Sequence, residues 1–352
     1  TFGFVRVLFF GGPVSNLKKL LEQIEISHRR HGLFRKNDRL VLGVSGGPDS
    51  VALLMLFDKL KKKYSLTFHI AHLNHGLLKS ESRKYQYLVQ KISKKMGFSF
   101  HCKAIEIRKR AKIHKRSLEE TGRIERYRFF EEVARKTGAN KIITAHTLND
   151  QAETLLLRLL RGSGLKGLAG IPCKRPQGKF TVIRPLLSCK KKDLVAFLKE
   201  NKIAFVRDKT NREWLFTRNR VRHQLLPMLK KFYNPQITRA LASLQSICSE
   251  AQDYMERVSG RAFRRCVARG SGTPTVALKI KRLQKLHPAI GREVLLKALG
   301  TVKGDLKKFT YDHIAAVMDI LNSREKNLEC HLPGHLVAKK NGENLVFYSR
   351  RE

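Results

Sequence analysis

The sequence predicts an α/β protein with a doubly wound parallel sheet, a helical linker and a smaller α+β domain towards its end. Strand-like apolar runs alternate with helical patterns in the first half of the chain, and this alternation favours a parallel sheet with helices on both faces. The strands are expected at 39–44, 66–73, 98–105 and 141–145, and the helices between and after them at 49–63, 80–96, 117–137 and 148–160. The length of 352 residues is enough for two domains.

Further elements are expected on either side of this alternation. Ser15 is a suitable N-cap for a helix that runs to about His31. Later helical patterns occur at 190–201, 218–260, 281–299 and 310–322, the second of them broken at Pro227 and Pro235. The last pattern is a hairpin, in which HLVAKK and NLVFYS flank an Asn341-Gly342 turn. Parallel sheets bind ligands at the carboxyl ends of their strands, so the residues directly after each strand are the first site candidates.

The charge of the chain is strongly positive. There are 72 Lys and Arg residues against 29 Asp and Glu, which gives a formal net charge of +43. Self-repulsion on this scale excludes the surface of an ordinary metabolic enzyme and predicts a polyanionic partner. Apolar residues make up 42% of the chain, which argues against intrinsic disorder because so many apolar side chains allow packed cores.

The sequence also favours a cytoplasmic protein without a membrane segment. No apolar stretch reaches the roughly 18–20 residues that a membrane-spanning helix needs. Residues 1–10 are apolar but carry Arg6 and no small-residue cleavage site, so they are not interpreted as a signal peptide. The six cysteines are widely spaced and form no Cys-x-x-Cys pair, which argues against a zinc ribbon or a disulfide framework.

The strongest motif directly follows the first predicted strand and opens a helix. It reads Ser45-Gly46-Gly47-Pro48-Asp49-Ser50. Glycines let the backbone turn tightly and bring its N–H groups near an anion, and a helix N-terminus adds a favourable dipole for phosphate. The alternative is a plain strand-to-helix turn with a serine cap. A Walker A loop would need Gly-x-x-x-x-Gly-Lys, which the chain lacks, so kinase-like or GTPase-like chemistry is not indicated.

This motif resembles the pyrophosphate loop of the N-type ATP pyrophosphatases, which have the adenine nucleotide alpha hydrolase-like fold. These enzymes split ATP into AMP and pyrophosphate while they adenylate a carbonyl oxygen. The resemblance implies ATP as co-substrate and Mg²⁺ as cofactor. It also implies that Asp49 serves the magnesium ion or the reacting phosphate, and that ATP is bound by Ser45, Gly46, Gly47, Pro48, Asp49 and Ser50.

A second cluster begins where the fourth predicted strand ends. It reads His146-Thr147-Leu148-Asn149-Asp150-Gln151-Ala152-Glu153-Thr154. Asp150 and Glu153 are three residues apart on one helical face, where they can meet a cationic amine or a metal ion. The pattern from Thr147 to Asp150 is equally typical of a helix cap, and an acid in a first helical turn is common.

With the residues that follow it, this cluster resembles the second signature of the tRNA(Ile)-lysidine synthetase family. Other segments match the family in the same order, namely Asn74-His75-Gly76, the set Glu120, Arg123, Arg126 and Tyr127, Arg184-Pro185-Leu186-Leu187, Asp208 with Asn211, and Arg218-Asn219 with Arg222. The similarity covers about residues 38–230 and thins after 250. Asn149 stands where the family usually has an acid, and Leu78 stands where many members carry Arg.

The resemblance implies an ATP-dependent tRNA-modifying ligase. Its substrates would be free L-lysine and the tRNA(Ile) that has a CAU anticodon. Lysine would join C2 of cytidine 34 through an adenylated cytidine, with release of AMP and pyrophosphate, and decoding would change from AUG to AUA. Lysine must react as the neutral amine, so a nearby acid should bind its ammonium form and accept its proton.

The resemblance also implies roles for individual residues. The expected catalytic residues are Asp49, Asp150 and Arg207, and the expected lysine-binding residues are Asp150 and Glu153. Two further ATP contacts are expected at His72 and Arg123. The expected tRNA-binding residues are Arg126, Arg161, Arg218 and Arg222.

The same reasoning divides the chain into four segments. These are an N-terminal extension at 1–14, a PP-loop ATP pyrophosphatase catalytic domain at 15–216, a helical linker at 217–250 and a small tRNA-binding C-terminal domain at 251–352. The oligomeric state is left open by the sequence, and a homodimer is one option.

Two other functions fit parts of the sequence. The first is a different PP-loop enzyme. A cytidine thiolase typically needs paired cysteines or an iron–sulfur cluster, and the missing Cys-x-x-Cys pair counts against it. An amidotransferase needs a source of ammonia, and no glutaminase domain is recognised in the sequence. The second is a non-catalytic, basic RNA-binding protein. ATP–pyrophosphate exchange that depends on tRNA would separate the enzyme from this RNA-binding protein.

Overall fold

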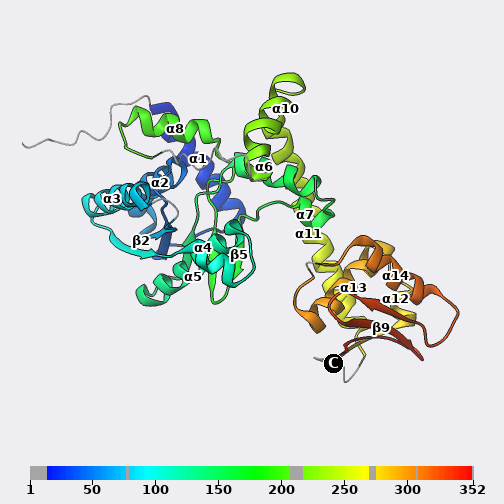
Figure 1. Cartoon of the computed structure of the whole chain (residues 1–352). Coiled ribbons are helices and arrows are strands. Elements are labelled where there is room, and N and C mark those ends of the chain that lie inside the picture. The colour runs from blue at the N-terminus through cyan, green and yellow to red at the C-terminus, as the bar shows by residue number, and fades with distance from the viewer. Residues whose placement is uncertain (1–13, 77–78, 207–216, 269–274, 307, 351–352) are drawn as a thin grey trace, which may run out of the picture. The chain divides into compact units, whose positions relative to one another are not determined.

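The protein forms two compact units, Thr1–Ile247 and Cys248–Glu352 (Figure 1). The structure is a computed structural model and describes residues 14–76, 79–206, 217–268, 275–306 and 308–350. The division falls inside one long helix, α11 (Ile237–Cys266), in the part of the chain where a helical linker is expected. The domain boundary expected at 216 lies outside the described residues.

The first unit is built on a six-stranded sheet with the order β3-β2-β1-β4-β6-β5. Its strands are β1 (Arg39–Gly43), β2 (Thr67–Asn74), β3 (Ser99–Ala104), β4 (Lys141–Ile143), β5 (Lys174–Gln177) and β6 (Phe180–Ile183). Five neighbouring strands run parallel to one another, in the sheet order β3, β2, β1, β4 and β6. The edge strand β5 pairs antiparallel with β6. The predicted doubly wound parallel sheet is confirmed, with the hairpin of β5 and β6 as an unpredicted addition.

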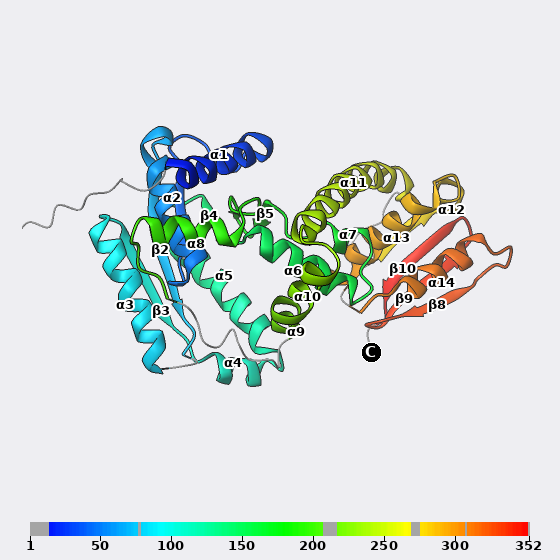
Figure 2. The ribbon, with the colours of Figure 1, turned by 90° about the horizontal axis from the view of Figure 1, so that it is seen from above.

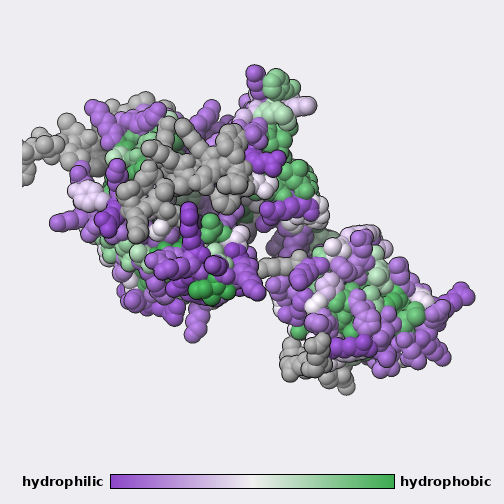
Figure 3. Space-filling model, viewed as in Figure 1, coloured by the Kyte–Doolittle hydropathy of each residue, from purple (hydrophilic) through white to green (hydrophobic). Residues whose placement is uncertain are grey.

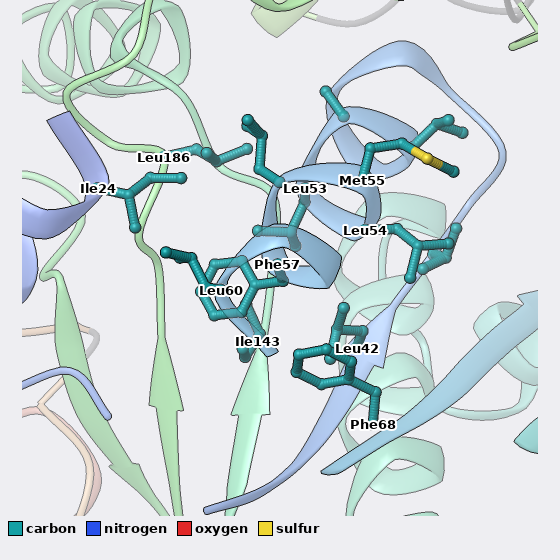
Figure 4. Close-up of a cluster of buried hydrophobic side chains, with 14 of the residues drawn as sticks. Ile24, Leu42, Leu53, Leu54, Met55, Phe57, Leu60, Phe68, Ile143 and Leu186 are labelled. Carbon is teal, nitrogen blue, oxygen red and sulfur yellow. The ribbon is translucent and has the colours of Figure 1, made fainter. Parts of the chain in front are cut away.

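Helices cover both faces of this sheet (Figure 2). They are α1 (Val14–His31), α2 (Pro48–Tyr64), α3 (Lys79–Lys95) and α8 (Lys191–Glu200) on one face, and α5 (Leu118–Thr137), with α4 (Ile107–Ile113) packed on it, on the other. Successive side chains of a strand point to opposite faces of the sheet. In β1, Leu40 and Leu42 therefore pack under α2, whereas Val41 packs against α5. Figure 4 shows Leu53 and Phe57 of α2 within the first of these cores.

A separate helical cluster completes the first unit. It contains α6 (Leu148–Leu159), α7 (Leu165–Leu168), α9 (Thr217–Arg220), the π-helical turn η2 (Val221–Leu225), α10 (Leu226–Phe232) and the first turns of α11. Val221 and Leu226 pack against Leu155 of α6, which fixes the α9–η2 segment beside the start of α6. The predicted break at Pro227 is wrong, because Pro227 lies in the first turn of α10 and the helical run passes through η2 without a loop.

The second unit is a small α+β structure. Its antiparallel sheet has the order β7-β10-β9-β8, with β7 (Thr275–Lys279), β8 (Glu329–Leu332), β9 (Leu336–Asn341) and β10 (Asn344–Ser349). Helices α12 (Ile280–Leu283), α13 (Pro288–Lys303) and α14 (Tyr311–Asn322) share its core. The predicted final hairpin is confirmed, but its turn is shifted by one residue. Asn341 pairs with Asn344, so the two loop residues are Gly342 and Glu343.

The surface reflects the composition of the chain. On the face shown in Figure 3, most of the described surface is hydrophilic and the apolar areas between are small. None of the described helices combines the length and the apolar character needed to cross a membrane.

Candidate active site

The loop between β1 and α2, at the carboxyl end of the sheet, contains the predicted phosphate-binding motif. Gly46 has a φ of +88°, a conformation that favours glycine, and Gly47 is the N-cap of α2. The Ser50 hydroxyl accepts a hydrogen bond from the Ser45 N–H at 3.1 Å and donates one to the Gly47 carbonyl oxygen at 2.9 Å. The loop is thereby folded against the N-terminus of a 17-residue helix, where an anion is stabilised.

The predicted ATP ligand His72 is buried at the end of β2 and braces this loop. Its Nδ1 donates to the Val44 carbonyl oxygen at 2.9 Å. Burial lowers the pKa of His72, so the ring is neutral at pH 7. The Gly46 carbonyl oxygen accepts a hydrogen bond from the Val206 N–H at 2.9 Å. These two bonds fix the backbone directly before the motif and at its second residue.

Asp49 lies in the first turn of α2, and its two carboxylate oxygens differ in their surroundings. Oδ2 accepts a hydrogen bond from the Lys191 Nζ at 2.9 Å, whereas Oδ1 is buried without a hydrogen-bond partner among the described residues. Burial raises the pKa of Asp49 above its usual range, and the charge of Lys191 opposes this. Mg²⁺ is typically held by one or two carboxylates together with substrate phosphates. The partnerless oxygen beside a phosphate-binding loop therefore fits the expected magnesium ion.

Two arginines from the α9–η2 segment meet the two acids of α6. Glu153 is 2% exposed and accepts hydrogen bonds from Arg222 at 2.7 and 2.8 Å and from Arg218 at 3.3 Å. The Asp150 Oδ2 accepts hydrogen bonds from the N–H and the hydroxyl of Thr147, both at 2.8 Å. The Asp150 Oδ1 lies 3.4 Å from Arg222 and 3.5 Å from Arg218. Asp150 is thus both a helix cap and a carboxylate with a less tightly bound oxygen, whereas Glu153 is fully engaged.

The protonation states of this cluster follow from its neighbours. Burial raises the pKa of Asp150, but the hydrogen bonds from Thr147 and the charge of Arg218 together lower it below its usual range. Burial lowers the pKa of His146 to about 3. At pH 7 the site therefore presents an ionised Asp150 beside a neutral imidazole. The Lys191 Nζ contacts Asp49, and the Lys191 backbone N–H donates to the Oδ1 of Asn149, the neighbour of Asp150, so the loop and the α6 cluster belong to one site.

Three arginines surround the buried ring of Tyr127. Arg184 is fully buried and donates hydrogen bonds to the Tyr127 hydroxyl at 3.2 Å and to the Pro172 carbonyl oxygen at 2.7 Å. The guanidinium carbons of Arg175 and Arg123 lie 4.6 and 5.6 Å from the ring centroid. Burial raises the pKa of Tyr127, but the charge of Arg184, hydrogen bonds from Arg175 and Arg184, and the charge of Arg123 lower it to about 8. Arg123, a predicted ATP contact, is therefore part of a cationic cluster.

The other predicted site residues differ in their positions. Arg126 is exposed and has its guanidinium 3.4 Å from the His75 Nε2. Arg161 is exposed just beyond the end of α6, apart from the site. Arg207 lies outside the described residues. The structure brings four predicted residues into contact, namely Asp150, Glu153, Arg218 and Arg222. The fifth, Asp49, is connected to the start of α6 through Lys191.

Sequence reasoning missed two contacts of this site. Lys191 comes from the first turn of α8, 142 positions away from Asp49. The Asn149 Oδ1 accepts a hydrogen bond from the Lys191 backbone N–H at 3.1 Å, so the amide at this position caps α8. The basic run at 190–192 was the only signal for Lys191, and it does not indicate which lysine faces the loop.

Comparisons with known proteins give matches over most of the chain. The family model of the PP-loop domain matches residues 14–229. The chain is 32% identical to the tRNA(Ile)-lysidine synthase of Clostridioides difficile over 327 residues, which are 93% of this chain and 70% of that protein. It is 32% identical to the tRNA(Ile)-lysidine synthase of Geobacter sulfurreducens over 337 residues, which are 96% of this chain and 70% of that protein.

Among solved structures, the U34-tRNA thiolase NcsA of Methanococcus maripaludis with its [4Fe-4S] cluster shares the fold. The TM-score is 0.53 at 15% sequence identity, over 65% of this chain and 78% of that chain. The described residues of the present chain include all six cysteines, each of them free. No group of three potential metal ligands from Cys, His, Asp or Glu occurs in that part of the chain. The likeness therefore supports the fold, and the cysteines give no support to thiolase chemistry.

Proposed function

Because the chain belongs to the tRNA(Ile)-lysidine synthase family, we propose that it uses ATP to join free L-lysine to C2 of cytidine 34 in the CAU anticodon of tRNA(Ile). The modified tRNA then decodes AUA instead of AUG. The observation that carries this proposal is that Lys191 joins the 45–50 loop to the start of α6, where α6, α9 and η2 form the acid–arginine cluster. The loop suits the phosphates of ATP, and the cluster offers a carboxylate for an amine and cations for a phosphate.

In the first step, O2 of the cytidine attacks the α-phosphorus of ATP. A bond forms between O2 and the α-phosphorus, the bond to the bridging oxygen breaks, and pyrophosphate leaves with that electron pair. We assign the pyrophosphate to the loop from Ser45 to Ser50 and to the N-terminus of α2. Asp49 would hold Mg²⁺, which when bound neutralises phosphate charge. AMP is a much better leaving group than an amide-like oxygen, so this step prepares C2 for attack.

In the second step, the ε-amine of lysine attacks C2. The new C–N bond forms, the bond between C2 and the adenylated oxygen breaks, and AMP leaves. We assign Asp150 to bind the amine and accept the proton that its nitrogen loses, because the Asp150 Oδ1 has only long contacts of 3.4 and 3.5 Å. Glu153 is engaged by Arg222 and Arg218, so we assign to it the positioning of these arginines, whose charges stabilise the departing phosphate.

The remaining predicted residues are proposed to bind the two larger substrates. Arg126 and Arg161 are exposed cations suited to phosphates of the tRNA backbone. Arg123 is proposed to contact the nucleotide. His72 is proposed to act indirectly, because its hydrogen bond to Val44 holds the loop that binds the phosphates. Arg207 is proposed as a further cation for the reacting phosphate and lies outside the described residues.

The test is transfer of labelled lysine to unmodified tRNA(Ile) with a CAU anticodon, in the presence of ATP. The methionine tRNA is the control, because it shares that anticodon. We expect transfer to the isoleucine tRNA alone. Asp150→Asn should lower transfer by about 100-fold or more, whereas Asp253→Asn, which changes an exposed acid of α11, should leave it unchanged. Absence of transfer by the unaltered protein, or full activity of Asp150→Asn, would contradict the proposal.

A further inference from the structure

A lysine from a distant part of the chain lies at the phosphate-binding loop. The Lys191 Nζ is 2.9 Å from the Asp49 Oδ2, and the two side chains are 42% and 21% exposed. The loop itself contains no Lys or Arg from Val44 to Ser50. The structure thus places a lysine beside a motif that contains no cation of its own. A Walker A motif binds phosphates with a residue of the same kind.

The position of Lys191 is fixed by its helix. The apolar residues Leu194 and Phe197 of α8 share a core with Leu53 and Phe57 of α2, so the two helices are packed together. The first turn of α8 is held by the hydrogen bond from the Lys191 N–H to Asn149. The backbone of Lys191 is therefore anchored at both the core and the cap, and only its side chain is free to move between partners.

The negative charges of a bound triphosphate would require a further cation near the loop. Arg222 donates two hydrogen bonds to Glu153, and Arg218 contacts both acids of α6. These arginines already have carboxylate partners at the α6 end of the site. A bound triphosphate would bring several negative charges to the loop beside Asp49. If Asp49 holds Mg²⁺, its carboxylate gains a second cation and Lys191 becomes available to a phosphate oxygen.

We propose that Lys191 is a catalytic residue that contacts the pyrophosphate part of ATP and stabilises it as it leaves. This inference rests on the proposed function for the identity of the reaction. In the adenylation step the bond from the α-phosphorus to the bridging oxygen breaks, and the electron pair stays on the pyrophosphate. The positive charge of the Lys191 Nζ balances the charge that develops on that oxygen.

The test compares Lys191→Met with Lys192→Met. Lys192 is the next residue in the same basic run and is exposed, so it is a matched control. Binding of inorganic pyrophosphate and of adenosine is measured with the full chain in the presence of Mg²⁺. We expect Lys191→Met to weaken pyrophosphate binding about 10- to 100-fold, as expected for a lost hydrogen bond to a charged group, and to leave adenosine binding unchanged. Lys192→Met should bind both as the unaltered protein does.

Two conservative variants separate a phosphate contact from a structural ion pair. Lys191→Arg should retain most of the pyrophosphate affinity because it keeps a cation, and Lys191→Gln should lose it as the Met variant does. Equal pyrophosphate binding by the unaltered protein and Lys191→Met would overturn the proposal, as would a parallel loss of adenosine binding in every Lys191 variant. These measurements need neither tRNA nor lysine. A protein that binds pyrophosphate through Lys191 but transfers no lysine would refute the proposed function alone.

Discussion

At the scale of single residues, Asp150 and Glu153 look alike in the sequence but differ in their partners. Glu153 is buried and accepts three hydrogen bonds from two arginines, whereas one oxygen of Asp150 has only longer contacts. Removing the charge of Glu153 leaves Arg222 and Arg218 without their main partner. We expect Glu153→Gln to lower the free energy of unfolding by about 2 to 4 kcal/mol.

Asp150→Asn is the matched comparison for this prediction. Its Oδ2 mainly caps α6, a contribution of about 1 kcal/mol, so its effect on stability should be smaller and its effect on lysine transfer larger. Denaturant unfolding and lysine transfer measured on both variants provide the check. Equal losses of stability would show that the two acids do not have the separate roles assigned to them.

The lowered pKa of Tyr127 predicts that the free energy of unfolding depends on pH. Its pKa is lowered from 10.0 to about 8, so above pH 8 the folded protein releases a proton that the unfolded chain still binds. The free energy of unfolding should therefore gain a contribution as the pH rises from 8 to 10, reaching about 2 to 3 kcal/mol above pH 10. This contribution is lost as the pH falls through about 8, and Tyr127→Phe lacks it. Unfolding of both proteins at pH 7 and pH 10 is the measurement, and an equal difference at both values would contradict the prediction.

At the scale of elements, the first turn of α8 connects Asn149 with Lys191. Asn149→Ala removes the acceptor for the Lys191 N–H and should cost about 1 kcal/mol of stability. It should also weaken pyrophosphate binding, because the first turn carries the Lys191 side chain. Asn149→Asp keeps an acceptor, so we expect it to preserve both properties. Thermal unfolding and pyrophosphate binding decide the matter, and an Asn149→Ala protein equal to the unaltered one would remove the role of this cap.

The elements that the sequence predicted are those with a strong periodic pattern. The four strands β1 to β4 and the helices α2, α3 and α5 were expected within a few residues, and most of them bury a clear apolar run. The short helix α4 was not expected. The hairpin of β5 and β6 was not expected. β5 reads KRPQ and is an edge strand without buried residues, where polar side chains and Pro176 are tolerated.

The site was predictable only where neighbouring residues form a motif. The loop at 45–50 and the pair Asp150 and Glu153 were visible for this reason. The partners of these residues were not visible as partners, because they arrive through tertiary packing. Arg222 is 69 positions from Glu153, and Lys191 is 142 positions from Asp49. A local sequence pattern does not indicate contacts between residues that are so far apart in the chain.

At the scale of the whole molecule, the net charge of +43 predicts how tRNA binding responds to salt. Each phosphate that the protein neutralises should add about 0.7 to 0.9 to the slope of log K against log salt concentration. Arg161→Gln removes one exposed cation, and the slope should fall by about that amount. The measurement is a salt titration of tRNA binding by both proteins. An unchanged slope would remove Arg161 from the tRNA interface.

The central claim is that ATP activates a carbonyl oxygen of the tRNA before lysine reacts. ATP–pyrophosphate exchange measured with unmodified tRNA(Ile) and without lysine tests this claim most directly. We expect exchange that requires the tRNA, does not require lysine, and falls when Asp49 is replaced by Asn. Exchange of equal rate without tRNA, or no exchange with it, would contradict adenylation of the tRNA as the first step.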